Sequence, residues 1–123
     1  MSGSKKVLVV DDQAEVRAVA ARWLVREGFD VEVACSAEEA LSAVSRQAPD
    51  LVCLDIELPG MSGTEALKQL LALCPGLRVL VLSGHDEHEV GSDVARLGAA
   101  GFMGKPFNRV QLGAAVRALI DPI

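Results

Sequence analysis

The sequence is poor in aromatic residues and has no excess of basic ones. Three phenylalanines, one tryptophan and no tyrosine occur in 123 residues, so Leu, Val and Ala must fill most of the core. Twelve Lys and Arg stand against 17 Asp and Glu, which leaves a formal net charge of -5. Domains that bind nucleic acid usually carry a basic face. We therefore expect no direct nucleic-acid binding by this chain.

Long apolar runs are also missing, and none is long enough to cross a membrane. The first residues do not read as a secretory signal, because the apolar run 7–10 leads directly into two aspartates. Cys35, Cys53 and Cys74 have no metal-type spacing and cannot all pair. They are best explained as reduced structural thiols. These features predict a cytoplasmic protein without membrane association.

What the sequence does contain is a regular alternation of short apolar runs and amphipathic stretches. Strands are predicted at residues 7–10, 31–34, 51–54, 79–82 and 100–103. A helix is expected after each strand; Gly28 should end the first, Ser36 should cap the second, and Gly91 should lie inside the fourth. This alternation is typical of an α/β domain with a parallel sheet covered on both faces. We expect one domain over residues 1–123, with residues 1–5 as a flexible lead.

Polar residues follow four of the five predicted strands. Asp11 and Asp12 follow the first strand, Asp55 the third, Ser83 the fourth, and Lys105 lies just beyond the fifth. Ligands of open parallel sheets bind beyond the carboxyl ends of the strands, so these side chains should converge. Taken singly, each aspartate or the serine could be a turn or cap residue, and the lysine a solvated charge. Their convergence at one edge favours a functional site.

The chemistry of this set is that of phosphoryl transfer. Three neighbouring carboxylates repel one another unless a cation lies among them. Oxygen ligands with room for water suit Mg²⁺ better than Zn²⁺. A carboxylate can attack phosphorus and form an acyl phosphate. Lys105 could then hold one phosphoryl oxygen as a point charge, and the Ser83 hydroxyl could donate a hydrogen bond to another.

Four segments resemble, in sequence and in order, the receiver domains of bacterial two-component response regulators. They are the Asp11-Asp12 pair, LDIELPGMSG at 54–63, VLSG at 81–84 and GFMGKPF at 101–107. The resemblance covers essentially the whole chain, and the four motifs together are highly specific. It implies a flavodoxin-like, doubly wound five-stranded parallel sheet with strand order 2-1-3-4-5 and five helices. It also implies that Asp55 accepts a phosphoryl group from a sensor histidine kinase or a histidine phosphotransfer protein.

The resemblance further assigns the residues around a Mg²⁺ ion. Asp12 and Asp55 should bind the metal directly, Asp11 should act largely through metal-bound water, and Glu57 should offer its backbone carbonyl. Glu57 and His85 occupy the two variable positions that influence the lifetime of the phosphoryl group in this family. A solvated loop histidine is the simpler explanation for His85.

The same resemblance implies a conformational switch. Lys105 should pair with Asp55 before phosphorylation and with the phosphoryl group afterwards, and the Lys105-Pro106 peptide bond should be cis. Ser83 should move toward the phosphoryl group, and Phe102 should turn inward on the face formed by the fourth helix, fifth strand and fifth helix. A static Phe102 is the simpler alternative. A downstream output domain or protein and a phosphorylation-dependent homodimer are left open as partners.

Two other classes of protein fit parts of the pattern. Haloacid-dehalogenase-like phosphatases also use an aspartate after a strand, with a serine and a lysine after later strands. Those enzymes, however, carry the nucleophile after their first strand and need a longer chain to enclose a substrate. The other class is a non-enzymatic module, either a flavodoxin-like FMN carrier or a receiver that signals without phosphate. FMN binding needs a phosphate loop, and none is visible.

Overall fold

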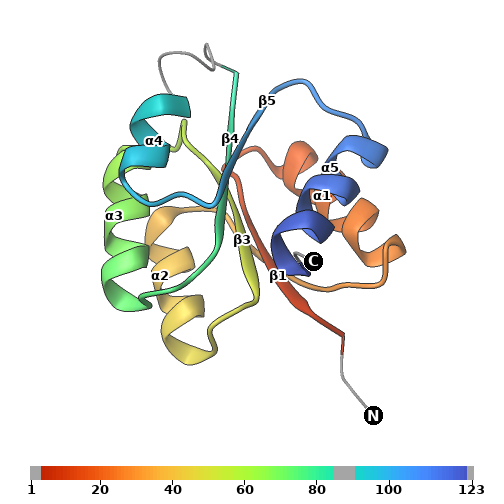
Figure 1. The fold of residues 1–123 in the computed structure, drawn as a ribbon, viewed down its shortest axis with the longest axis horizontal. Helices are drawn as coiled ribbons and strands as arrows, with labels where there is room; N and C mark the ends of the chain where they lie inside the picture. Colours follow the sequence, from red (N-terminus) through yellow and green to blue (C-terminus); the bar gives the residue numbers. More distant parts are fainter. Residues whose placement is uncertain (1–3, 85–90, 122–123) are drawn as a thin grey trace.

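The computed structural model describes residues 4–84 and 91–121, and residues 1–3, 85–90 and 122–123 lie outside the described part. Strands and helices alternate along the whole described chain (Figure 1). The strands are β1 (Lys6–Val10), β2 (Asp30–Ala34), β3 (Leu51–Asp55), β4 (Val79–Ser83) and β5 (Gly101–Gly104). The helices are α1 (Ala14–Arg26), α2 (Ala37–Arg46), α3 (Gly63–Leu73), α4 (Ser92–Arg96) and α5 (Arg109–Ile120).

The five strands form one parallel sheet in the order β2-β1-β3-β4-β5. This confirms the predicted fold class and strand order. The central strands β1, β3 and β4 are buried almost throughout, whereas the edge strands β2 and β5 are only partly covered. Continuous apolar runs predict such central strands because helices cover both faces of a parallel sheet.

Each face of the sheet has its own hydrophobic core. On one face, α2, α3 and α4 cover side chains such as Leu8, Val52 and Val81. On the other, α1 and α5 cover the alternate side chains of the same strands, such as Val9 and Cys53. Figure 1 shows these helices as two layers on either side of the sheet. Successive strand side chains point to opposite faces, so five short strands supply both cores.

The helix boundaries follow the sequence signals in most places. Gly28 has a φ of 99° just after α1, a conformation that glycine adopts without steric cost. Ser36 Oγ accepts a hydrogen bond from the Glu39 amide and caps α2. Gly91 has helical backbone angles, with φ -59° and ψ -42°, and directly precedes α4, which begins at Ser92; this agrees with its predicted place in the fourth helix. Glycine is a poor helix former, so it weakens this helix.

The three cysteines are free thiols. Cys53 lies inside β3, and burial raises its pKa to about 12, so this thiol is not a nucleophile at neutral pH. Cys35 is exposed and Cys74 is partly buried. Across the described residues, no helix has the length and apolar character needed to span a membrane.

Candidate functional site

Three of the predicted site residues form a buried charge cluster at the carboxyl edge of the sheet. Asp55 is the last residue of β3, and Asp11 follows β1 directly. Both are almost completely buried, with 3% and 2% of their surface exposed. Lys105 reaches them from beyond β5, with Nζ 3.3 Å from Asp55 Oδ2 and 3.5 Å from Asp11 Oδ2. The predicted convergence of Asp11, Asp55 and Lys105 is therefore present.

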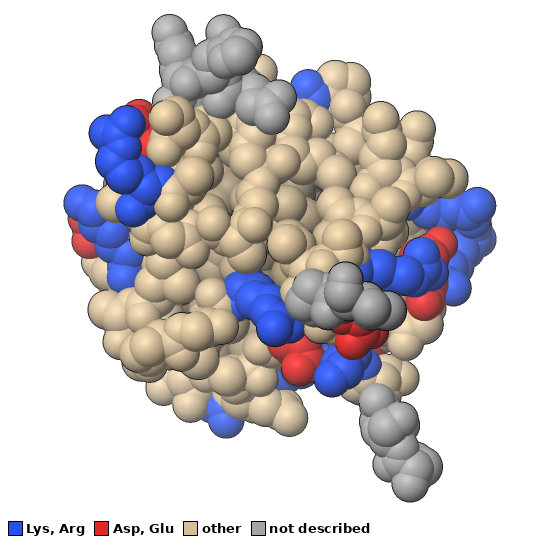
Figure 2. Space-filling model, in the orientation of Figure 1, with Lys and Arg blue, Asp and Glu red and all other residues tan. Residues whose placement is uncertain are grey.

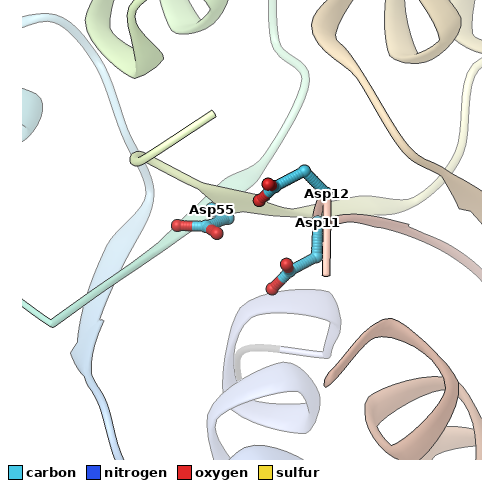
Figure 3. A group of neighbouring side chains, drawn as sticks. All are labelled: Asp11, Asp12 and Asp55. Atoms are coloured by element: carbon cyan, nitrogen blue, oxygen red, sulfur yellow. The ribbon is translucent and has the colours of Figure 1, made fainter. Parts of the chain in front are cut away.

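Asp12 completes an acidic triad. One carboxylate oxygen each from Asp11, Asp12 and Asp55 can be chosen so that all lie within 4.8 Å of one another, and Figure 3 shows the three side chains at the same end of the sheet. Asp12 is exposed, so the cluster is open to solvent on one side. Asp11 Oδ2 is buried, and within the described residues its contact is the 3.5 Å ion pair with Lys105 rather than a well-formed hydrogen bond. A buried carboxylate beside two more, with one lysine to offset three negative charges, fits a hard divalent cation such as Mg²⁺.

The charges of the cluster act on one another. Burial raises the pKa of the Asp11 carboxyl, and the negative charge of Asp55 adds to this effect. Burial alone would lower the pKa of the Lys105 ammonium, but the charges of Asp55 and Asp11 together outweigh it and the pKa is raised. Lys105 is therefore a firmly charged cation between two carboxylates. A lysine in this place compensates part of their repulsion.

The loop after β3 holds Asp55 in place. The Glu57 amide donates a hydrogen bond of 2.9 Å to Asp55 Oδ1, so one carboxylate oxygen is fixed by the backbone and the other faces Lys105. The start of α3 presses against the same loop at Gly63. A Cβ atom there would lie 2.3 Å from the Ile56 carbonyl oxygen and 2.4 Å from its Cα. Only glycine permits α3 to lie this close to the loop. The sequence motif alone did not predict this contact.

Ser83 and the loop after β4 lie at the same edge. Ser83 is completely buried at the end of β4, and its carbonyl accepts a hydrogen bond of 2.7 Å from the Lys105 amide. The next residue, Gly84, donates from its amide to Glu57 Oε1 at 3.4 Å. Glu57 therefore links the β3–α3 loop to the β4–α4 loop. The sequence indicated Glu57 as a residue beside the site but not this contact.

The remaining predicted residues are placed as follows. Phe102 lies on β5 opposite Val81 of β4 and is partly buried against the core under α2, α3 and α4. The Lys105-Pro106 peptide bond is cis. His85 lies outside the described residues. Phe102 therefore lies at the rim of this core.

An apolar hollow of about 390 Å³ opens beside the charge cluster. It lies between α1 and the segment after β5, where Trp23 and Phe107 meet edge to face with ring centroids 6.5 Å apart. Val19, on its wall, is 37% exposed. The hollow is lined by Glu15, Val16, Val19, Ala20, Trp23, Lys105, Pro106 and Phe107. Lys105 thus belongs both to this hollow and to the charge cluster.

The acidic triad, the lysine and the buried serine agree with what the family resemblance implies, and comparison with known proteins decides the family. The sequence model of the family described as response regulator receiver domain matches residues 7–117. This chain belongs to that family. The match runs from the second residue of β1 through most of α5 and includes every residue of the charge cluster. The receiver domain is a signalling domain of two-component systems, and this chain is one of them.

Curated and solved relatives support the assignment. The receiver domain is 32% identical to the sporulation initiation phosphotransferase F of Bacillus subtilis over 93% of this chain and 92% of that protein. It is 37% identical to the alkaline phosphatase synthesis transcriptional regulatory protein PhoP of the same organism, over 95% of this chain but 49% of that protein. The chain thus covers nearly the whole length of the phosphotransferase and about half the length of PhoP.

The fold agrees equally well with solved receiver domains. A CheY-like response regulator receiver domain protein from Methanospirillum hungatei aligns with a TM-score of 0.91 at 30% identity, covering 97% of this chain and 95% of that one. The receiver domain of NtrX from Brucella abortus aligns at 0.89 and 34% identity, covering 95% and 99%. Domains of this family interact with histidine kinases and with output domains.

Proposed function

We propose that Asp55 is the phosphoacceptor of this receiver domain and takes its phosphoryl group from a phosphohistidine. The donor is a sensor histidine kinase or a histidine phosphotransfer protein. One observation carries the proposal: a buried carboxylate at the end of the central strand lies 3.3 Å from a lysine and within 4.8 Å of two further carboxylates. A carboxylate held this way can act as a nucleophile toward a phosphoryl group.

The transfer forms one bond and breaks one. An oxygen of Asp55 bonds to phosphorus, the bond between phosphorus and the donor imidazole nitrogen breaks, and its electron pair stays on that nitrogen. The Glu57 amide holds Asp55 during the attack through its hydrogen bond to Oδ1. Lys105, which pairs with Asp55 Oδ2, turns to an oxygen of the arriving group, and the Ser83 hydroxyl donates to another.

Mg²⁺ is the metal that these residues would hold. Asp12 and Asp55 would bind it directly, the Glu57 carbonyl would complete the protein ligands, and Asp11 would act through water. When bound, the ion neutralises the negative charge that the phosphoryl group brings among three carboxylates. The excess of negative charge supports this choice, because three carboxylates converge here and the ion pairs with Lys105 offset only one of the three charges.

Mg²⁺ is expected to stabilise the unphosphorylated domain and to be required for its phosphorylation. At a concentration one hundred times its dissociation constant, the ion should raise the free energy of unfolding by about 2.7 kcal/mol. Urea unfolding at constant ionic strength, with and without Mg²⁺, measures this. Labelling by acetyl phosphate should stop in excess chelator. Asp12→Asn should lose the stabilisation and Asp93→Asn, an exposed carboxylate on α4, should keep it; equal gains in both variants would show that the ion binds elsewhere.

We infer that the donor protein docks on the hollow between α1 and the segment after β5. The hollow is mostly apolar, and it shares Lys105 with the charge cluster. An apolar ridge of a donor helix seated there would bring its histidine near Asp55. Buried apolar anchors commonly supply most of the binding energy of an interface.

A charge placed in this hollow should impair transfer from a protein but not from a small molecule. Val19→Asp is expected to lower phosphotransfer from a histidine kinase about tenfold, which corresponds to about 1.4 kcal/mol. Val25→Asp is the matched control, because Val25 lies on the same helix, is 57% exposed and is not on the wall of the hollow. Both variants should react with acetyl phosphate at the wild-type rate. The kinase used should be the one that phosphorylates the wild type fastest in a screen. Equal losses of phosphotransfer rate in Val19→Asp and Val25→Asp would contradict the docking site.

Phosphorylation would switch the face made by α4, β5 and α5. Ser83 and Phe102 are the proposed relay: the serine hydroxyl moves to the phosphoryl group, and Phe102, already partly buried on β5, turns into the space this opens. Charged side chains lie mainly around the rim of this face, and its centre over β5 is uncharged (Figure 2). Such a surface suits contact with an output domain, a separate protein or a second copy of the chain.

The switch predicts where the protein responds to a phosphate mimic. With beryllofluoride and Mg²⁺, amide chemical shifts should change most at Ser83, Gly84 and Phe102. Gly84 should respond because its hydrogen bond to Glu57 must adjust when Ser83 moves. The amides of α2 are the internal reference. Changes no larger at Phe102 than in α2 would mean that Ser83 and Phe102 are not the relay.

The chain acts in this account as a phosphoacceptor rather than as an enzyme with a separate substrate. Its own residues promote both the arrival and the hydrolysis of the phosphoryl group, and Glu57 and His85 would set the lifetime of the phosphorylated state. The three free cysteines suit a reducing compartment, and the proposed location is the cytoplasm.

A further inference from the structure

Arg17 makes a contact next to the charge cluster that neither the motif nor the proposed reaction accounts for. It lies on the first turns of α1 and is partly buried. Its Nη1 donates a hydrogen bond of 2.7 Å to the backbone carbonyl of Asp11. Hydrogen bonds from a charged guanidinium are short and strong. This one ties a helix side chain to the loop that carries two of the three carboxylates.

The carbonyl that Arg17 holds belongs to the peptide unit joining Asp11 to Asp12. Asp11 has further ties: its amide donates to the Ala34 carbonyl, and its Oδ1 accepts from the Gln13 amide at 2.9 Å. Asp12 has no comparable support, since its exposed carboxylate accepts no hydrogen bond from a residue in the described ranges. The direction of the Asp12 side chain therefore depends on the backbone, and Arg17 fixes the peptide plane just before it.

We propose that Arg17 is a positioning residue that holds Asp12 in the orientation required to bind Mg²⁺. It acts through the Asp11 carbonyl and does not touch the metal or the phosphoryl group. The inference rests on the proposed function, because it concerns the same metal site. Residues that orient metal ligands commonly contribute tenfold or more to metal affinity.

The positive charge of Arg17 makes a positioning role distinguishable from a purely electrostatic one, because the two roles change the Mg²⁺ affinity in opposite directions. A guanidinium beside an acidic cluster repels a divalent cation, so its removal should strengthen Mg²⁺ binding if charge were its main effect. A positioning role predicts the opposite, because Asp12 loses its orientation when the contact is lost. The two effects differ in direction and not merely in size.

The test is Mg²⁺ affinity of the unphosphorylated protein, measured by amide chemical-shift titration at constant ionic strength. Arg17→Gln is expected to weaken Mg²⁺ binding about tenfold. Arg46→Gln is the control, because the Arg46 guanidinium also donates a hydrogen bond, to the Glu32 carboxylate on β2, but lies at the C-terminal end of α2. It should bind Mg²⁺ as the wild type does. Arg17→Lys, which keeps the charge and a donor, should lie between the wild type and Arg17→Gln.

The Mg²⁺ dependence of the phosphorylation rate distinguishes a weakened metal site from a general loss of activity. Phosphorylation of Arg17→Gln by acetyl phosphate should need about tenfold more Mg²⁺ for half its maximal rate, and the maximal rate should return to within about twofold of wild type. Unchanged or tighter Mg²⁺ binding in Arg17→Gln would overturn the inference, as would a rate that stays depressed at saturating Mg²⁺, or an Arg17→Lys protein that binds Mg²⁺ more tightly than the wild type. A wild-type protein that binds no Mg²⁺ would instead overturn the proposed function.

Discussion

Replacement of Asp55 by asparagine is expected to abolish phosphorylation by acetyl phosphate. The amide keeps the size of the side chain and an oxygen that can accept the Glu57 hydrogen bond, but it lacks the negatively charged oxygen that attacks phosphorus. Removing the nucleophile of a covalent mechanism lowers its rate by about a thousandfold or more. Intact-mass spectrometry with acetyl phosphate and Mg²⁺ measures the effect directly.

The control for this prediction is Asp30→Asn. Asp30 is an exposed carboxylate at the amino end of β2, at the opposite edge of the sheet from Asp55. That variant should gain one phosphoryl group at the wild-type rate. Incorporation by Asp55→Asn at an undiminished rate would mean that another carboxylate is the acceptor. Circular dichroism should show that both variants keep the fold.

Gly63→Ala is expected to destabilise the protein strongly, because Gly63 begins α3 at the point where the helix packs against the loop that supports Asp55. The new Cβ would lie 2.3–2.5 Å from three atoms of Ile56, two of them in the backbone. Overpacking of this kind costs about 3 kcal/mol, and the gain in helix propensity from Gly to Ala recovers at most about 1 kcal/mol. Because Ile56 precedes Glu57, whose amide holds Asp55, phosphorylation should slow as well. Urea unfolding gives the stability change.

Gly104→Ala is the matched control for that substitution. A Cβ at Gly104 would meet no atom closer than the Ser83 carbonyl oxygen at 4.0 Å, so the variant should unfold at the wild-type urea concentration or slightly above it. Equal stability of Gly63→Ala and Gly104→Ala would show that α3 can move away from the loop. In that case the close approach at Gly63 would not be what positions Glu57.

Much of the fold was predictable because short apolar runs and helical spacing determine it. The continuous runs of β1, β3 and β4 are buried on both faces, and the residues directly after strands converge at the carboxyl edge as the topology of parallel sheets requires. Asp11, Asp55 and Lys105 could therefore be placed together from the sequence. The fourth helix was less predictable, since Gly91 is a poor helix former and yet has helical φ and ψ.

The contacts that support the site could not be predicted from the sequence. The bond from Arg17 to the Asp11 carbonyl depends on how α1 leaves the loop, and the Glu57–Gly84 bond joins loops 27 residues apart. The apolar hollow is lined by Trp23 of α1 and by Phe107, which are far apart in the sequence but meet in the fold. A helical pattern predicts which residues are buried but not which backbone carbonyl a long side chain reaches.

The central claim is that Asp55, with Mg²⁺, takes the phosphoryl group, and identification of the modified residue tests it most directly. The protein is labelled with acetyl phosphate and Mg²⁺, and borohydride then reduces the acyl phosphate, which converts the modified aspartate to homoserine. Tandem mass spectrometry of the digested protein locates it. We expect homoserine at position 55 alone, and none when a chelator replaces Mg²⁺. Homoserine at Asp11 or Asp12, or labelling of Asp55 that is unchanged without Mg²⁺, would contradict it.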